Sequence, residues 1–128
     1  MNTSLITSKL SKLEAEAVDQ FFRNLRKIVG VDLQLVGLFG SMARGEAWAQ
    51  SSTNRSDIDL LIVTENFLDK DTRQKIDKWT YDLFLYGGRQ ISPQYRDVKW
   101  MQHPPDQEGK DFIETLKNEM IPIYIKDD

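Results

Sequence analysis

Two aspartates separated by one residue, Asp57 and Asp59, stand at the head of an apolar run that ends at Val63. A run of Ile, Leu and Val of this length is typical of a buried β-strand, along which side chains alternate between the two faces of the sheet. The two carboxylates are therefore expected on the same face, about 6.5–7 Å apart along the chain. Neighbouring carboxylates beside buried residues are unfavourable unless a cation lies between them. Because Mg²⁺ is small and hard and prefers oxygen ligands, the pair predicts a magnesium site.

A glycine-serine turn precedes the aspartates. The strand predicted from Asp32 to Phe39 is broken by Gly40, and Ser41 is expected to cap a short helix that continues toward Arg44 and Gly45. Such a turn exposes backbone N–H groups at the positive end of a helix, where a phosphate binds, and the glycine allows the ligand a close approach. It is neither a Walker A loop nor a GxGxxG fingerprint. Taken alone, the turn can be a part of the fold that binds no ligand, and the aspartate pair can be two solvated acids at the end of a strand.

Hydrophobic periodicity and turn signals place the other elements. A capping box, Ser11-x-x-Glu14, opens an amphipathic helix that Gly30 can end, and its apolar face is expected to pack on the core rather than on a partner. The other predictions, in chain order, are a helix from Asp69 or Asp71 to about residue 79, an aromatic-rich strand over 80–86, a turn at 87–88 into a short strand at 89–92, a long connection over 93–105, a helix over 111–120 and a short edge strand over 121–125.

Length, charge and composition limit the class of protein. The 128 residues suit one domain with a buried core, and the absence of cysteine excludes disulfides and thiolate metal sites. A formal charge of −3 provides no basic field for nucleic acid. No apolar stretch approaches the roughly 20 residues of a membrane span, and the N-terminus lacks a secretory signal pattern. These features predict a cytoplasmic globular domain with neither a membrane nor a nucleic acid as its partner.

Taken together, Gly40-Ser41 and the later Asp57-Ile-Asp59 stretch resemble the signature of the DNA polymerase β-like nucleotidyltransferase superfamily. The segment Phe39–Ala47 is most similar to the minimal nucleotidyltransferases (MNT), a short prokaryotic branch, and the shared motif spans residues 36–63. The chain departs from the pattern at Met42, where an arginine is usual, and by a longer loop before the aspartates. The resemblance implies a single MNT domain over residues 1–128. It also implies an α+β fold, a two-layer mixed β-sheet with helices packed on it, like the polymerase β palm.

The resemblance also implies a chemistry. The family carries a third acid on a later strand, and Asp82 is the only carboxylate in the apolar segment 80–86. The reaction implied is transfer of a nucleoside monophosphate, AMP from ATP, to a hydroxyl group with release of pyrophosphate. The residues implied to hold Mg²⁺, for which Mn²⁺ can substitute, are Asp57, Asp59 and Asp82. Asp82 is also implied to help deprotonate the acceptor. The residues implied to bind the nucleotide are Gly40, Ser41, Arg44 and Gly45.

Partners follow from the same resemblance. MNT proteins often accompany a helical HEPN protein and act as antitoxins by transferring AMP to it, so a HEPN-type protein that completes the acceptor site is expected here. The alternative is a binding module, an antitoxin of weak catalytic activity that neutralises its partner by direct binding; the departure at Met42 leaves room for it. Nucleic-acid polymerisation is disfavoured by the acidic balance. The sequence leaves open the acceptor, the nucleotide and whether the chain forms a homo-oligomer.

Overall fold

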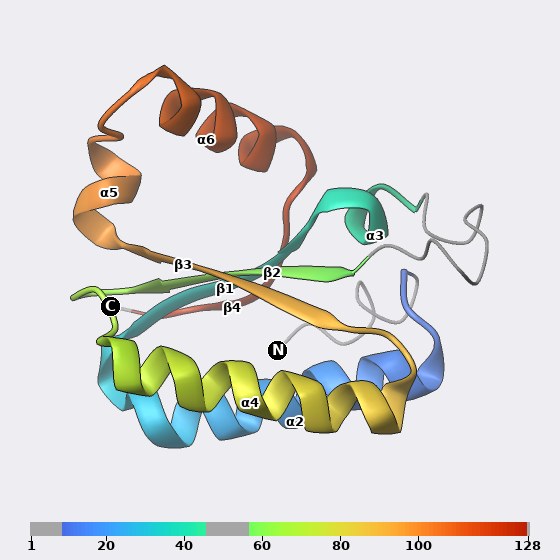
Figure 1. The fold of residues 1–128 in the computed structure, drawn as a ribbon. Helices are drawn as coiled ribbons and strands as arrows, with labels where there is room; N and C mark the ends of the chain where they lie inside the picture. Colours follow the sequence, from blue (N-terminus) through green and yellow to red (C-terminus); the bar gives the residue numbers. More distant parts are fainter. Residues whose placement is uncertain (1–8, 46–56, 128) are drawn as a thin grey trace.

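A mixed four-stranded sheet lies between two groups of helices in the computed structural model, which describes residues 9–45 and 57–127 (Figure 1). The strands are β1 (Leu33–Phe39), β2 (Ile58–Thr64), β3 (Ile91–Asp97) and β4 (Ile121–Ile125). The helices are α2 (Lys12–Val29), the 3₁₀ turn η1 (Gly30–Asp32), α3 (Gly40–Arg44), α4 (Lys70–Gly87), α5 (Val98–Gln102) and α6 (Gln107–Glu119). The predicted α+β fold, a mixed sheet with helices packed on it, is confirmed. The polar loop predicted up to Ser56 lies outside the described residues from position 46 onward.

The sheet brings the two motifs together. Its strand order is β3-β2-β1-β4, with β1 antiparallel to both β2 and β4, and β2 parallel to β3. Because β1 and β2 run in opposite directions, the end of β1 lies beside the start of β2, and Phe39 pairs with Asp59. The turn that begins at Gly40 therefore lies next to the aspartates. On the other side of β2, Asp59 pairs with Ser92 of β3.

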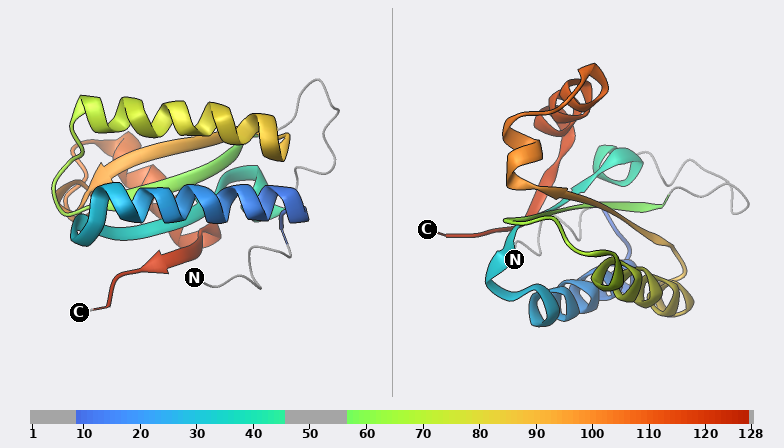
Figure 2. Two further views of the ribbon diagram at one scale, coloured as in Figure 1. Left: turned by 90° about the horizontal axis from the view of Figure 1, so that it is seen from below. Right: turned by 60° about the vertical axis from the view of Figure 1, so that its left-hand side comes forward.

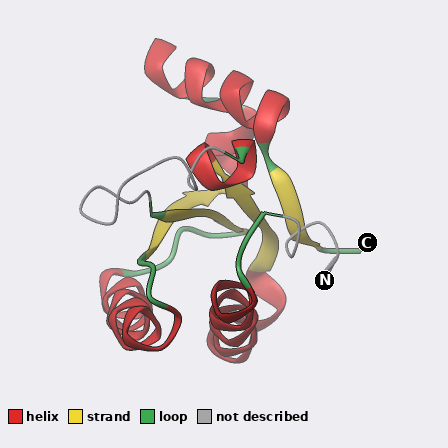
Figure 3. Cartoon of the chain, turned by 90° about the vertical axis from the view of Figure 1, so that its right-hand side faces the viewer, coloured by secondary structure: helices red, strands yellow, loops and turns green. Residues whose placement is uncertain are grey.

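Helices cover both faces of the sheet, so the mixed sheet has a helical layer on each side rather than the single helical layer of the predicted two-layer arrangement. Figure 2 shows α2 and α4 side by side across one face, and Figure 3 shows them at the opposite side of the sheet from α6. Along β2, Ile58, Leu60 and Ile62 point into the core beneath α2 and α4, whereas Leu61 and Val63 pack toward α6 with Leu116. This alternation is the one expected of a central strand buried on both faces.

The predicted first helix is confirmed at both ends. The Ser11 N–H donates to Glu14 Oε1 at 2.9 Å, and the Glu14 N–H donates to Ser11 Oγ at 3.2 Å, which is a complete capping box. Gly30 ends the helix at φ +66°.

The strand predicted over residues 80–86 is wrong, because this segment continues helix α4 from its N-cap at Asp69 to Gly87. Its aromatic residues favour a strand locally, yet no glycine or proline interrupts the chain before Gly87-Gly88. Ile76 and Thr80 are buried four residues apart, so the segment already presents one inward face at helical spacing. Tertiary packing on α2 then decides between the two conformations.

The C-terminal half also differs from prediction. The segment predicted as a long connection over 93–105 instead contains most of β3 and the short helix α5, and the strand expected at 89–92 begins at Ile91 and extends to Asp97. The final helix starts earlier than expected, at Gln107, because the Asp106 side chain accepts a hydrogen bond from the Gly109 N–H at 2.8 Å. The edge strand over 121–125 is confirmed. Within the described ranges, no helix has the length and apolar character needed to cross a membrane.

Candidate active site

The turn between β1 and α3 is built around Gly40. This residue has φ +76°, a conformation in which an L side chain is strained. A Cβ atom placed on it would overlap Oδ2 of Asp59, so the carboxylate lies directly against the backbone of the turn. The predicted N-cap role of Ser41 is wrong, because the N-cap of α3 is Phe39, two residues earlier, and it forms no side-chain cap hydrogen bond. The group that approaches Gly40 closely is thus the Asp59 carboxylate, and the approach of a ligand to this glycine stays a prediction.

Alanine at Gly40 should therefore push Asp59 away from the turn. We expect Gly40→Ala to destabilise the protein by about 1–3 kcal/mol through backbone strain and overlap, and to weaken the binding of Mg²⁺-ATP that the family resemblance implies. Gly88→Ala is the matched control, since Gly88 also has φ +76° but has no atom within 4 Å of a built Cβ. Thermal melting and nucleotide titration of both variants would check this. Equal destabilisation of the two variants, with unchanged nucleotide binding, would show that the overlap between position 40 and Asp59 has no effect beyond backbone strain.

The two aspartates lie together at the start of β2. Asp57 is exposed and directly precedes the strand, whereas Asp59 is its second residue and is partly buried. Burial and the negative charge of Asp57 raise the pKa of Asp59 to about 6; Arg44 opposes this shift and Glu119 adds to it. The predicted electrostatic conflict between the carboxylates is thus present, and a nearby cation would relieve it.

The donor set fits Mg²⁺ in one particular way. No group of three or more acidic, histidine or cysteine side chains capable of holding a metal occurs in residues 9–45 and 57–127. Asp57 and Asp59 remain as a pair of carboxylates beside the turn. Mg²⁺ is commonly held by one or two carboxylates, with substrate phosphates and water as its remaining ligands. The residues present therefore fit a metal that arrives with a nucleotide.

Asp82 is not brought to this pair. It is exposed on α4, on the opposite side of the sheet from α6 (Figure 1). Its assignment as the third carboxylate rested on the incorrect strand over 80–86, so the structure gives it no place beside Asp59. The strand that does adjoin β2 is β3, and its residue paired with Asp59 is Ser92. A hydroxyl therefore occupies the neighbouring position on the next strand.

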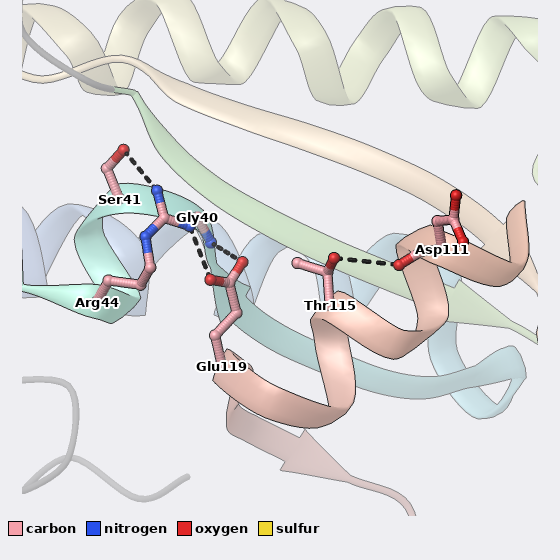
Figure 4. A network of polar contacts seen from close by, with 6 residues as sticks. All are labelled: Gly40, Ser41, Arg44, Asp111, Thr115 and Glu119. Atoms are coloured by element: carbon pink, nitrogen blue, oxygen red, sulfur yellow. Dashed lines mark hydrogen bonds and ion pairs between the residues drawn. The ribbon is translucent and has the colours of Figure 1, made fainter. Parts of the chain in front are cut away.

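A network of polar contacts covers the turn from the side of α6 (Figure 4). Glu119, the last residue of α6, accepts a hydrogen bond from the Gly40 N–H through Oε1 at 3.2 Å. Its Oε2 pairs with Nη1 of Arg44 at 2.7 Å. Arg44 Nη2 also donates to Ser41 Oγ at 3.4 Å. Gly40, Ser41 and Arg44 share this network with an acid that the sequence did not single out, and their binding of a nucleotide stays a prediction.

Gly45 and Met42 stabilise the fold: Gly45 ends α3, and Met42 packs in the core. The Gly45 N–H donates to the Met42 carbonyl at 3.1 Å, and its φ of +75° ends α3, so this backbone group is used within the helix. The Met42 side chain is 2% exposed and belongs to the main core. A cation at position 42 would have to leave that core to reach a ligand. Arg44 supplies the positive charge close to Asp59 instead.

A family model confirms the resemblance that the sequence carries. The model for polymerase β nucleotidyltransferases matches residues 16–103, more than half of the chain. The chain belongs to this family. No curated protein matches this nucleotidyltransferase.

Solved structures share the fold of this nucleotidyltransferase at low sequence identity. A toxin–antitoxin complex with AMP-PNP matches with a TM-score of 0.54 at 17% identity, over 84% of this chain and 73% of the other. A tri-AMPylated HEPN toxin in complex with MNT antitoxin from Shewanella oneidensis matches with a TM-score of 0.52 at 15% identity, over 86% and 71%. A toxin–antitoxin mutant with two aspartates, one residue apart, replaced by glutamate matches with a TM-score of 0.53 at 13% identity, over 84% and 73%. This chain therefore shares its fold with a chain in each of these toxin–antitoxin structures.

Proposed function

We propose that this nucleotidyltransferase uses Mg²⁺ to transfer AMP from ATP to a hydroxyl group of a HEPN-type partner protein in the cytoplasm. The observation that carries the proposal is the contact of the Asp59 carboxylate with the Gly40 turn, beside Asp57. In this proposal, the carboxylate oxygens that would bind the metal lie next to the backbone N–H of Gly40 that would bind a phosphate. The family membership supports nucleotidyl transfer as the reaction class.

Each group of residues has a role in this proposal. Asp57 and Asp59 hold Mg²⁺, which when bound neutralises triphosphate charge and stabilises the departing pyrophosphate. The Gly40 N–H and the Ser41 hydroxyl orient the phosphates of ATP, and Arg44 adds a charge-assisted contact. Gly45 keeps Arg44 in place by ending α3 directly after it.

The acceptor is inferred from the similar structures. One of them contains AMP-PNP, and another contains an AMPylated HEPN toxin with its MNT antitoxin. This chain has the same fold, which supports ATP as the donor and a HEPN-type protein as the acceptor. A hydroxyl-bearing side chain of that partner would attack the α-phosphate, forming a phosphodiester bond as the bond to pyrophosphate breaks, and its proton would pass to solvent.

A second candidate function is neutralisation of the partner by binding alone. Two observations favour it: Ser92 stands where a third carboxylate could lie beside Asp59, and a carboxylate covers the Gly40 turn. Two acids rather than three would give a slow enzyme. Partner binding would then matter more than transfer.

Transfer of label from nucleotides separates the two functions. We expect labelled AMP to appear on the protein encoded by the gene beside that of this chain when Mg²⁺ and labelled ATP are added, with CTP, GTP and UTP tested in parallel. Alanine at both Asp57 and Asp59 should abolish the label and the neutralisation of the partner. Asp82→Asn is the matched control, because it removes an exposed carboxylate on α4 and should leave transfer unchanged. Neutralisation that survives the double alanine variant would favour binding alone, and absence of label with every nucleotide would refute the proposed reaction.

A further inference from the structure

The carboxylate of Glu119 is bound to two of the three groups that the proposed function assigns to a phosphate. One oxygen accepts the Gly40 N–H, and the other accepts a guanidinium N–H of Arg44 (Figure 4). We propose that Glu119 occupies the phosphate position of the turn in the nucleotide-free protein and is exchanged for the triphosphate when the nucleotide binds. Glu119 would thereby set the affinity for nucleotides. This inference rests on the proposed function.

The contacts are those that a phosphate would make. A carboxylate and a phosphate both present anionic oxygens that accept from backbone N–H groups and from the fork of an arginine. The Gly40 N–H has one hydrogen to donate, so Glu119 and a phosphate oxygen compete for it. Arg44 Nη1 lies 2.7 Å from Glu119 Oε2, so part of its donor capacity is also taken up by the carboxylate. A phosphate seated at the turn must therefore displace at least one oxygen of Glu119.

The environment makes the exchange electrostatically reasonable. The Glu119 side chain is 12% exposed and that of Arg44 is 42% exposed, so the ion pair lies at the surface end of the site and solvent can reach it. Glu119 adds a third negative charge near Asp57 and Asp59. A triphosphate entering with Mg²⁺ brings positive charge to the aspartates and needs the Glu119 carboxylate to leave.

Only the side chain has to move. Immediately after Glu119, the Met120 N–H donates to the Leu116 carbonyl at 2.9 Å, which closes the end of α6. The Met120 side chain packs against Gly37, where an added Cβ would overlap its sulfur atom. The next residue begins β4, which is paired with β1. The backbone at this corner is thus fixed, and rotation of the Glu119 side chain is enough to open the turn.

The test is binding of inorganic tripolyphosphate with Mg²⁺ to the full chain, followed by calorimetry and by the NMR signal of the Gly40 amide. Glu119→Gln keeps the shape of the side chain but removes its charge, and Glu119→Ala removes both oxygens. Each should bind tripolyphosphate about 5- to 10-fold more tightly than the unmodified protein, because an anion no longer competes for the turn. The Gly40 amide should shift on titration in all three proteins. Glu114→Gln is the matched control, since it makes the same charge change at an exposed site on the same helix and should leave the affinity unchanged.

The outcomes distinguish this inference from the proposed function. If the unmodified protein binds tripolyphosphate at Gly40 but neither Glu119 variant binds more tightly, the exchange is refuted while nucleotide binding stands. Binding that leaves the Gly40 amide unchanged also refutes it. If no protein binds tripolyphosphate, Glu119 has no competitor, and both the exchange and the proposed function fail. Thermal melting of the two variants identifies any loss of affinity that comes from unfolding.

Discussion

Replacing Asp59 with asparagine should stabilise the metal-free protein at neutral pH and lower nucleotide transfer on the order of 100-fold or more. The loss of transfer follows from removing one of two proposed metal ligands. The gain in stability follows from the position of the carboxylate, which is partly buried beside Asp57 and has its pKa raised to about 6. Asparagine has nearly the same shape and carries no charge. A carboxylate kept at a cost to stability is typical of an active site.

The effect on stability should depend on pH with a definite sign. The pKa of Asp59 is about 6 in the folded protein and near its ordinary value of 3.8 when the chain is unfolded. Between these values the folded state binds more protons than the unfolded state, so the free energy of unfolding falls as the pH rises. The loss of stability caused by the Asp59 carboxylate is therefore complete above about pH 6 and absent below pH 3.8, the ordinary pKa of an aspartate. The advantage of Asp59→Asn should therefore be largest near neutral pH and disappear as the pH falls toward 3.8.

Thermal melting across this pH range, with and without Mg²⁺, would test the prediction. Mg²⁺ should stabilise the unmodified protein at neutral pH and have less effect on Asp59→Asn, because binding to the folded state raises its stability by mass action. Asp82→Asn removes the same charge from an exposed helix position and should show neither effect. An Asp59→Asn variant that melts below the unmodified protein at neutral pH without metal would show that the carboxylate is stabilising, contrary to the argument.

The parts of the site that could be predicted from sequence are those encoded by local pattern. An apolar run headed by two aspartates gave β2 with its acids, and a glycine after a buried strand gave the turn at Gly40. Their proximity follows from the antiparallel pairing of β1 with β2, which the structure shows. These features depend on strand alternation and on glycine chemistry, which act over a few residues.

The parts that could not be predicted depend on contacts between distant segments. Glu119 lies 79 positions after Gly40, and nothing around it in the sequence distinguishes it from the other acids of its helix. The sequence predicts the third carboxylate, Asp82, on a strand over residues 80–86. Aromatic side chains favour a strand there locally, but packing on α2 makes the segment helical. In both cases contacts between distant segments determine the structure, and hydrophobic periodicity over a short window does not reveal those contacts.

Removing the guanidinium of Arg89 should cause a large loss of stability in this chain. Arg89 lies between α4 and β3 and pairs with Glu14 of α2 through Nε and Oε2 at 2.8 Å. The two side chains are only 9% and 7% exposed. Glu14 also completes the capping box by accepting the Ser11 N–H. The pair therefore joins the start of α2 to the segment that leads into β3, the strand beside the aspartates.

Arg89→Ala leaves Glu14 buried without this partner, which should lower the free energy of unfolding by about 3–5 kcal/mol. Burial alone would raise the pKa of Glu14, but Arg89 and Ser11 together hold it below its ordinary value. The loss should therefore be full near neutral pH and diminish in acid, where a protonated Glu14 no longer needs a cation. Urea denaturation at several pH values measures both effects.

Two comparisons isolate the cause of that loss. Arg23→Ala breaks the ion pair with Asp19, whose side chains are 68% and 33% exposed, and should cost less than about 1 kcal/mol. The double variant Glu14→Gln with Arg89→Met removes both charges and should recover a substantial part of the stability that Arg89→Ala loses, because no buried charge is left unpaired. A double variant no more stable than Arg89→Ala would locate the loss in packing of the arginine stem rather than in an uncompensated carboxylate. Recovery would instead show that the two charges are kept as a matched pair, fixing α2 against the segment that positions β3.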